Sequence, residues 1–152
     1  MLQMDHLSKA ILRAQENRSR LVFFLDREGF LSELESYPSL SLNALLSEQL
    51  LEFPKQSRVR ETAQLVNQLL DEVDESTVLL QDIEILFDRS LAIDPMRLLA
   101  ASSKKKTLLV CWPGDKTSSG LSYAVPSHPE YRTYKTSDLG DVIFLTTDAQ
   151  LH

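Results

Sequence analysis

The chain has 152 residues, of which 43% are hydrophobic and 25% charged, and it contains one cysteine, Cys111. This length suffices for one domain with a sizeable core, since a domain of this size buries about 70% of its unfolded surface. A lone cysteine excludes an internal disulfide framework and a cysteine metal cage, and no apolar run has the length of a membrane span or the form of a secretion signal. We therefore expect a single cytoplasmic domain over residues 1–152.

Charge is distributed unevenly along the chain. The net charge is +2 over residues 1–20, −10 over 26–88 and +2 over 89–152. Nucleic acids are bound mainly by basic side chains that displace counterions from phosphates, so an acidic middle argues against direct nucleic-acid binding. The only basic cluster, Lys104–Lys106, falls between an expected helix and an expected strand, and we interpret it as a solvated turn.

The first half of the chain alternates between helix and strand patterns. Apolar residues at three- and four-residue steps predict a helix over 5–17, and the uninterrupted apolar run Leu21–Leu25 predicts a strand buried on both faces. The next expected elements are a short helix through Glu35, a brief strand over 39–42, a helix over 44–53 with Asn43 as its N-cap, and a long helix over 58–73. The buried side of the long helix is predicted to comprise Val59, Ala63, Val66, Leu69, Leu70 and Val73.

The second half continues the alternation. Residues 77–88, TVLLQDIEILFD, predict a buried strand that ends in acids, and Asp94 with Pro95 predicts a helix start, because aspartate accepts hydrogen bonds at the N-cap and proline needs no N–H at the first helical position. The elements expected after that helix are a buried strand TLLVCW, a loop PGDKTSSG, a strand LSYAV, an irregular segment PSHPEYR and a last strand over 142–146. This order predicts an α/β domain of three layers with a mainly parallel sheet.

Acids after a buried strand are typical of the magnesium-binding strand of a P-loop ATPase. Such an enzyme also needs the phosphate loop GxxxxGK[ST]. No two glycines of this chain are five residues apart, so the motif is absent in every register; they are Gly29, Gly114, Gly120 and Gly140. Where the first strand would lead into the loop, Asp26 and Glu28 would repel phosphates.

The segment GDKTSSG over 114–120 imitates the end of a phosphate loop through Lys116 and Thr117. Asp115 interrupts the glycine–lysine step, however, and a strand is expected where a helix would have to offer its N–H groups to the phosphate. We therefore interpret this segment as a hairpin-like loop.

Four segments of the second half together resemble a known family. They are TVLLQDIEILF, the helix start DPMRLL, the turn WPG and the segment YAVPSHPEYR. In this order they are similar to the BrxF family, the small P-loop proteins of type 3 BREX bacteriophage-defence systems. The resemblance implies an AAA-like P-loop core that works beside other BREX proteins, which recognise, methylate or restrict DNA.

The chain departs from that family where nucleotide would bind. In the register of the resemblance the metal-binding aspartate falls on Gln81, Asp82 follows one place later, and Glu84 matches the family's glutamate. A strand alternates faces, so Gln81 and Asp82 are expected on opposite sides, and glutamine is a poor magnesium ligand. We interpret the three residues as a Walker B remnant in a core that lacks the phosphate loop, and we expect no catalytic residue, nucleotide-binding residue, metal or cofactor.

These observations lead to one expected function and two alternatives. The expected function is that of a non-catalytic interaction component, a pseudo-ATPase, of a BREX-type complex. Its partners would be other BREX proteins such as an ATPase or a methyltransferase, with no membrane partner, and a homo-oligomer is compatible with the sequence. One alternative is a nucleotide-binding or weakly ATP-hydrolysing subunit whose site a partner completes; the other is a DNA-contacting accessory that uses Lys104–Lys106 and Arg132.

The segment PSHPEYR supplies the candidate partner contacts His128, Glu130, Tyr131 and Arg132. A histidine beside a carboxylate suggests acid–base chemistry, but no nucleophile accompanies the pair. Tyrosine and arginine dominate binding hot spots, so docking is the preferred interpretation. Trp112 and Cys111, at the end of TLLVCW, are expected to be buried.

Overall fold

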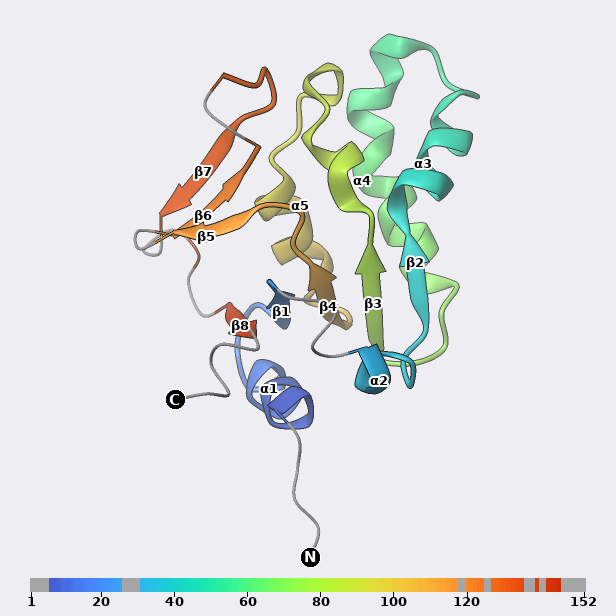
Figure 1. The fold of residues 1–152 in the computed structure, drawn as a ribbon. Helices are drawn as coiled ribbons and strands as arrows, with labels where there is room; N and C mark the ends of the chain where they lie inside the picture. Colours follow the sequence, from blue (N-terminus) through green and yellow to red (C-terminus); the bar gives the residue numbers. More distant parts are fainter. Residues whose placement is uncertain are drawn as a thin grey trace, which may run out of the picture.

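The computed structural model describes residues 6–25, 31–117, 120–124, 127–135, 139 and 142–145 (Figure 1). The helices are α1 (His6–Gln15), α2 (Leu31–Leu34), α3 (Leu42–Leu50), α4 (Lys55–Asp71) and α5 (Pro95–Ser102), with 3₁₀ turns η2 (Ile83–Phe87) and η3 (Arg89–Leu91). The strands are β1 (Leu21–Phe24), β2 (Ser39–Ser41), β3 (Thr77–Gln81), β4 (Thr107–Cys111), β5 (Asp115–Thr117), β6 (Gly120–Tyr123), β7 (Arg132–Lys135) and β8 (Ile143–Leu145).

Five strands form a parallel sheet in the order β2-β3-β4-β1-β8. The strands β1, β3 and β4 are short apolar runs whose residues are buried on both faces, apart from the half-buried last residues of β3 and β4. Such runs suit the inside of a parallel sheet, where helices cover both faces. The α/β class and the mainly parallel sheet are thus confirmed.

Helices cover both faces of this sheet. On one face α3, α4 and α5 pack on a core that includes Phe23, Leu80 and Val110. On the other face α1 and the end of α2 pack on Val22, Phe24, Leu79, Leu109 and neighbouring residues. Crossovers between parallel strands are right-handed. The step from β1 to β2 runs along the sheet in the opposite direction to the other steps, so α2, which lies between these strands, packs on the opposite face from α3, α4 and α5.

A second sheet, antiparallel and in the order β5-β6-β7, stands beyond the end of β4 (Figure 1). The hairpin of β5 and β6 pairs Thr117 with Gly120, which agrees with the hairpin-like loop inferred from GDKTSSG. The short strand β5 inside this segment, and the strand β7, which begins at the last residue of PSHPEYR, are not predicted from the sequence. Each has only three or four residues, and each pairs with β6.

Two details of the predicted helices are wrong. Helix α3 begins at Leu42 with Ser41 at its N-cap, so Asn43 is not the cap; its side chain instead accepts a hydrogen bond from the Ile85 N–H at 2.7 Å. Helix α4 begins at Lys55, before the predicted start, and Val59 is 37% exposed. Thr62 and Leu65 are buried on α4, because the helix turns a slightly different face to the sheet than the predicted one.

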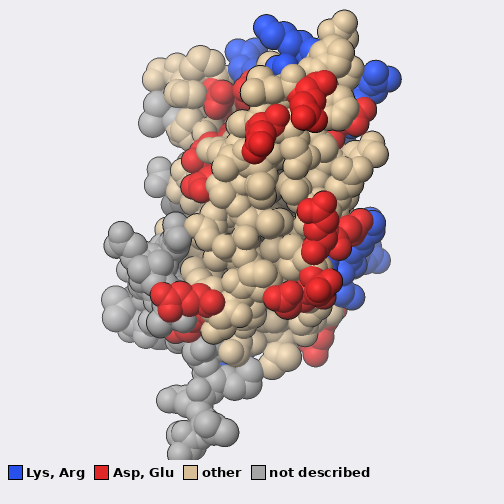
Figure 2. Space-filling model, turned by 90° about the vertical axis from the view of Figure 1, so that its right-hand side faces the viewer, with Lys and Arg blue, Asp and Glu red and all other residues tan. Residues whose placement is uncertain are grey.

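The lysine cluster is a turn, as interpreted. Lys104 and Lys105 are exposed, whereas Lys106 donates to the carbonyl oxygens of Val73 and Glu75 and so ties the turn to the end of α4. Figure 2 shows acidic side chains spread over one face of the molecule, with basic side chains towards its edges. None of the described helices is long and apolar enough to cross a membrane.

The start of α5 yields a stability prediction. Asp94 accepts from the N–H groups of Met96 at 3.1 Å and Arg97 at 3.5 Å, as the Asp-Pro pair predicts. Replacing Asp94 with Ala leaves these donors without the cap and is expected to lower the free energy of unfolding by about 1 kcal/mol. Urea denaturation measures this, and Asp94→Ser, which keeps an acceptor, is the matched control. Equal stability of the Ala and Ser variants would contradict a capping role.

Candidate functional site

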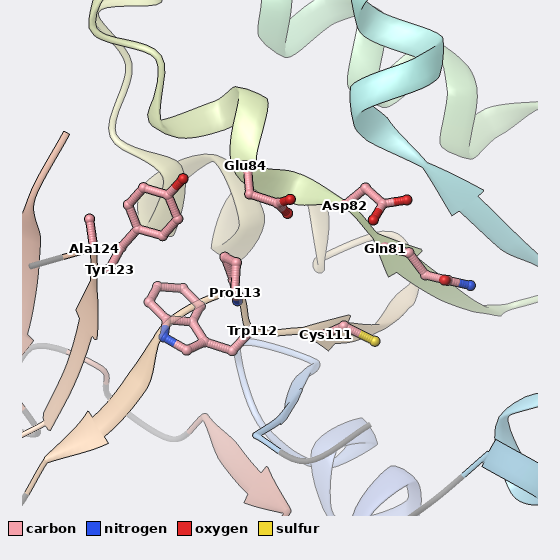
Figure 3. A pocket seen from close by; sticks show the side chains of 8 residues that line it. All are labelled: Gln81, Asp82, Glu84, Cys111, Trp112, Pro113, Tyr123 and Ala124. Carbon is pink, nitrogen blue, oxygen red and sulfur yellow. The ribbon is translucent and has the colours of Figure 1, made fainter. Parts of the chain in front are cut away.

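A pocket of about 400 Å³ lies at the carboxyl edge of the parallel sheet, after β3 and β4 (Figure 3). The carboxyl end of β4 is tied to that of β1, since the Trp112 N–H donates to the Phe24 carbonyl at 2.9 Å. The neighbouring strands β4 and β1 are followed along the chain by strands of the parallel sheet on opposite sides of this pair, β8 after β4 and β2 after β1. Ligands of open α/β sheets bind at such a switch point. The pocket is lined by Gln81, Asp82, Glu84, Cys111, Trp112, Pro113, Tyr123 and Ala124.

The acidic side of the pocket is set by the way β3 ends. Gln81 is its last residue, and Asp82 adopts the left-handed conformation, with φ 51° and ψ 55°. Aspartate tolerates this conformation better than most residues, so the chain can turn out of the sheet and start η2 at Ile83. The expectation that Gln81 and Asp82 alternate along one strand is therefore wrong, because the strand has already ended.

Hydrogen bonds to the start of α3 hold Asp82 in place. The Ser41 hydroxyl donates to the Asp82 carboxylate at 2.8 Å, and the Asn43 N–H donates to the Asp82 carbonyl at 2.9 Å. The bond from the Ile85 N–H to the Asn43 side chain fixes the following turn. Asp82 thus lies at the braced N-cap of η2 and Glu84 lies within η2, so neither is on a strand.

The aromatic side of the pocket comes from β4 and β6. Trp112 is 6% exposed, as predicted for a core residue, and its indole N–H donates to the Ser122 carbonyl at 3.0 Å. The Tyr123 ring stacks on Phe87 with centroids 3.9 Å apart and planes 14° apart. Figure 3 shows Tyr123 and Trp112 on one side, Asp82 and Gln81 on the other, and Glu84 between them.

The antiparallel sheet makes polar contacts with the residues that directly precede α5. Arg132 donates to the Ile93 carbonyl at 2.9 Å, and the Tyr134 hydroxyl contacts the Asp94 carboxylate at 3.5 Å.

A Cβ at Gly114 would collide with the Ser122 carbonyl, and one at Gly120 with the Tyr134 carbonyl. Both glycines of GDKTSSG therefore serve the close approach of strands.

The pocket has a negative electrostatic character. Among the described residues that line it, two are carboxylates and none is lysine, arginine or histidine. Burial raises the pKa of Tyr123 above its ordinary value of 10.0, and the nearby negative charges of Glu130 and Glu84 raise this pKa further. The phenol of Tyr123 therefore stays neutral near pH 7.

The predicted site residues divide into two groups. Gln81, Asp82 and Glu84 all line the pocket, whereas the four candidate partner contacts do not. His128 and Tyr131 are exposed, Glu130 is half-buried, and Arg132 is half-buried with its guanidinium bonded to Ile93. The His128 ring accepts from the backbone N–H of Glu130 at 3.0 Å, so this contact shapes a turn and does not pair the ring with the carboxylate.

Several pocket residues were missed or misplaced by the sequence analysis. Tyr123 was not singled out, although its place on β6 two residues after the buried Leu121 suggests the same inward face. Cys111 was expected to be buried but is half-buried, because β4 ends there and its side chain lines the pocket. Asp26 and Glu28, which were predicted to repel phosphates, lie outside the residues that the structure describes.

No protein-family model, curated protein or solved structure shows a significant match to the chain. Within the described ranges, no group of three or more histidine, cysteine and acidic side chains could hold a metal ion.

Tyr134 yields a prediction about alkaline pH. Burial, together with the negative charge of Asp94, raises the pKa of Tyr134 to about 12 from the ordinary value of 10.0. The unfolded chain loses this proton first, so the stability that neutral Tyr134 contributes is complete below pH 10.0 and is lost as the pH rises through about 12. Urea denaturation as a function of pH should therefore show a shallower alkaline loss for Tyr134→Phe than for the wild type. Parallel losses in the two proteins would contradict the assignment.

Proposed function

We propose that this chain is a non-catalytic, protein-binding component of a BREX-type phage-defence complex, built on an AAA-like P-loop core that lacks the phosphate loop. The observation that carries the proposal is the lining of the carboxyl-edge pocket, which has two carboxylates and no basic side chain among its described residues. This is the edge at which a P-loop core would hold its nucleotide.

Phosphate binding does not suit this lining. Nucleotide phosphates are held by backbone N–H groups of a glycine-rich loop, by lysine and by magnesium. The required glycine spacing is absent from the whole sequence, and Asp82 and Glu84 would repel the phosphates. A nucleotide would thus meet repulsion where an ATPase provides attraction.

Magnesium binding is not supported either. Gln81, at the family's metal position, is neutral and ends the strand. Asp82 lies beyond the strand in a left-handed turn, with one carboxylate oxygen accepting from Ser41. Magnesium in nucleotide sites is held in octahedral geometry by one or two carboxylates together with substrate phosphates. Asp82 and Glu84 are the carboxylates here, but none of the described lining residues is a lysine or arginine that would hold the phosphates.

Three of the four segments that carry the BrxF resemblance contribute residues to the pocket. The pocket takes Gln81, Asp82 and Glu84 from TVLLQDIEILF, Trp112 and Pro113 from WPG, and Tyr123 and Ala124 from the start of YAVPSHPEYR. Asp94, which begins DPMRLL, contacts Tyr134, and Arg132, which ends YAVPSHPEYR, donates to Ile93. The resemblance therefore concerns one local unit, which supports a shared way of binding without the shared nucleotide chemistry.

Calorimetry tests the absence of a nucleotide site. Titrating the protein with ATP and magnesium is expected to give no binding with a Kd below about 1 mM, because the pocket repels phosphate. Glu48→Ala, at an exposed position of α3, is the control for a general change in charge.

Micromolar ATP binding that Asp82→Ala abolishes and Glu48→Ala preserves would overturn the proposal. ATP hydrolysis that appears only when a purified partner subunit is added would favour the alternative of a nucleotide site completed between two proteins.

A further inference from the structure

The carboxyl-edge pocket has the size and rigidity of a specific receptor. Its volume of about 400 Å³ lies within the range of small-ligand sites. The Asp82 loop is braced against α3, and the aromatic side is fixed by the Tyr123–Phe87 stack and the Trp112–Ser122 hydrogen bond. Few side chains would have to become ordered on binding, so the entropic cost is low, and this favours affinity even for a small ligand.

The charge of the pocket selects a cation. The carboxylate of Glu84 makes no hydrogen bond or ion pair with any of the described residues, and Glu130 adds negative charge near Tyr123. Glu84 is half-buried, so its charge is only partly screened by water. A cationic ligand would gain attraction here that phosphate would lose.

The shape of the pocket selects a guanidinium. Acids on one side and the rings of Tyr123 and Trp112 on the other offer both contacts that arginine makes, namely paired hydrogen bonds to carboxylate and packing on aromatic rings. Lysine, a point charge on a flexible stem, uses the aromatic side less well.

The chain's own arginine on the adjacent sheet does not fill the pocket. Arg132 donates to Ile93, on the segment before α5, and is not part of the pocket lining. No arginine lines the pocket among the described residues, so we take its ligand from another protein.

We propose that the carboxyl-edge pocket binds an arginine side chain presented by a partner protein, with Glu84 and Asp82 as the carboxylate partners and Tyr123 as the packing surface. This inference rests on the proposed function, since it supplies the contact through which the chain would join its complex.

Trp112 allows a direct test, because it is the only tryptophan of the chain and lines the pocket. The probe is N-acetyl-arginine amide, and the neutral isostere N-acetyl-citrulline amide is its control. Tryptophan fluorescence and the indole N–H resonance of Trp112 report binding. We expect saturable binding of the arginine probe in the millimolar range, about tenfold weaker binding of the citrulline probe, and weakening of the arginine probe by added salt.

Variants assign the binding to the pocket carboxylates. Glu84→Gln is expected to weaken binding of the arginine probe about tenfold. Asp82→Asn, whose side chain can still accept from Ser41, should weaken this binding to a lesser extent. Glu48→Gln removes an exposed charge from α3 outside the pocket and should leave binding unchanged.

Equal binding of the two probes, or unchanged binding in both Glu84→Gln and Asp82→Asn, would overturn the arginine site. Either result could occur while the protein still fails to bind ATP, in which case only this inference fails. Tight ATP binding would instead overturn the proposed function.

Discussion

The indole of Trp112 joins the two sheets of this protein. Directly after β4, it contacts Phe23 of the parallel sheet edge-on at a centroid distance of 5.4 Å, Phe87 of η2 at 5.6 Å and Tyr134 of the antiparallel sheet at 6.0 Å. Its N–H donates to Ser122, which satisfies the polar atom that burial would otherwise leave without a partner. Without this attachment the aromatic side of the pocket would not be fixed against the acidic side.

The sequence predicts the parts of the fold that depend on local pattern. The strands Leu21–Phe24 and Thr107–Cys111 are buried apolar runs, and α5 starts at Pro95 after its Asp94 cap. These features need only neighbouring residues for their explanation. The parts that depend on distant contacts were wrong or missed: Asn43 bonds to Ile85 across 42 positions, and β7 is a strand only because β6 lies beside it.

The candidate site shows the same division. Gln81, Asp82 and Glu84 were found because acids after a buried strand indicate a sheet edge, but their geometry could not be read from strand alternation, since Asp82 turns out of the sheet at φ 51°. The importance of Tyr123 depends on its stacking with Phe87, 36 positions earlier in the chain, which no local pattern reveals. Glycine spacing excludes a phosphate loop, and the structure explains Gly114 and Gly120 by the close approach of neighbouring strands.

We propose that the carboxyl-edge pocket binds a partner protein and no nucleotide. Co-purification from the native host, with mass spectrometry of the bound proteins and analysis of any retained nucleotide, tests it most directly. We expect a BREX methyltransferase or ATPase in the eluate of the wild type, its loss with Glu84→Gln and its retention with Glu48→Gln, with no nucleotide bound to the isolated chain. Retained nucleotide on the isolated chain, with no BREX protein in the eluate, would contradict it.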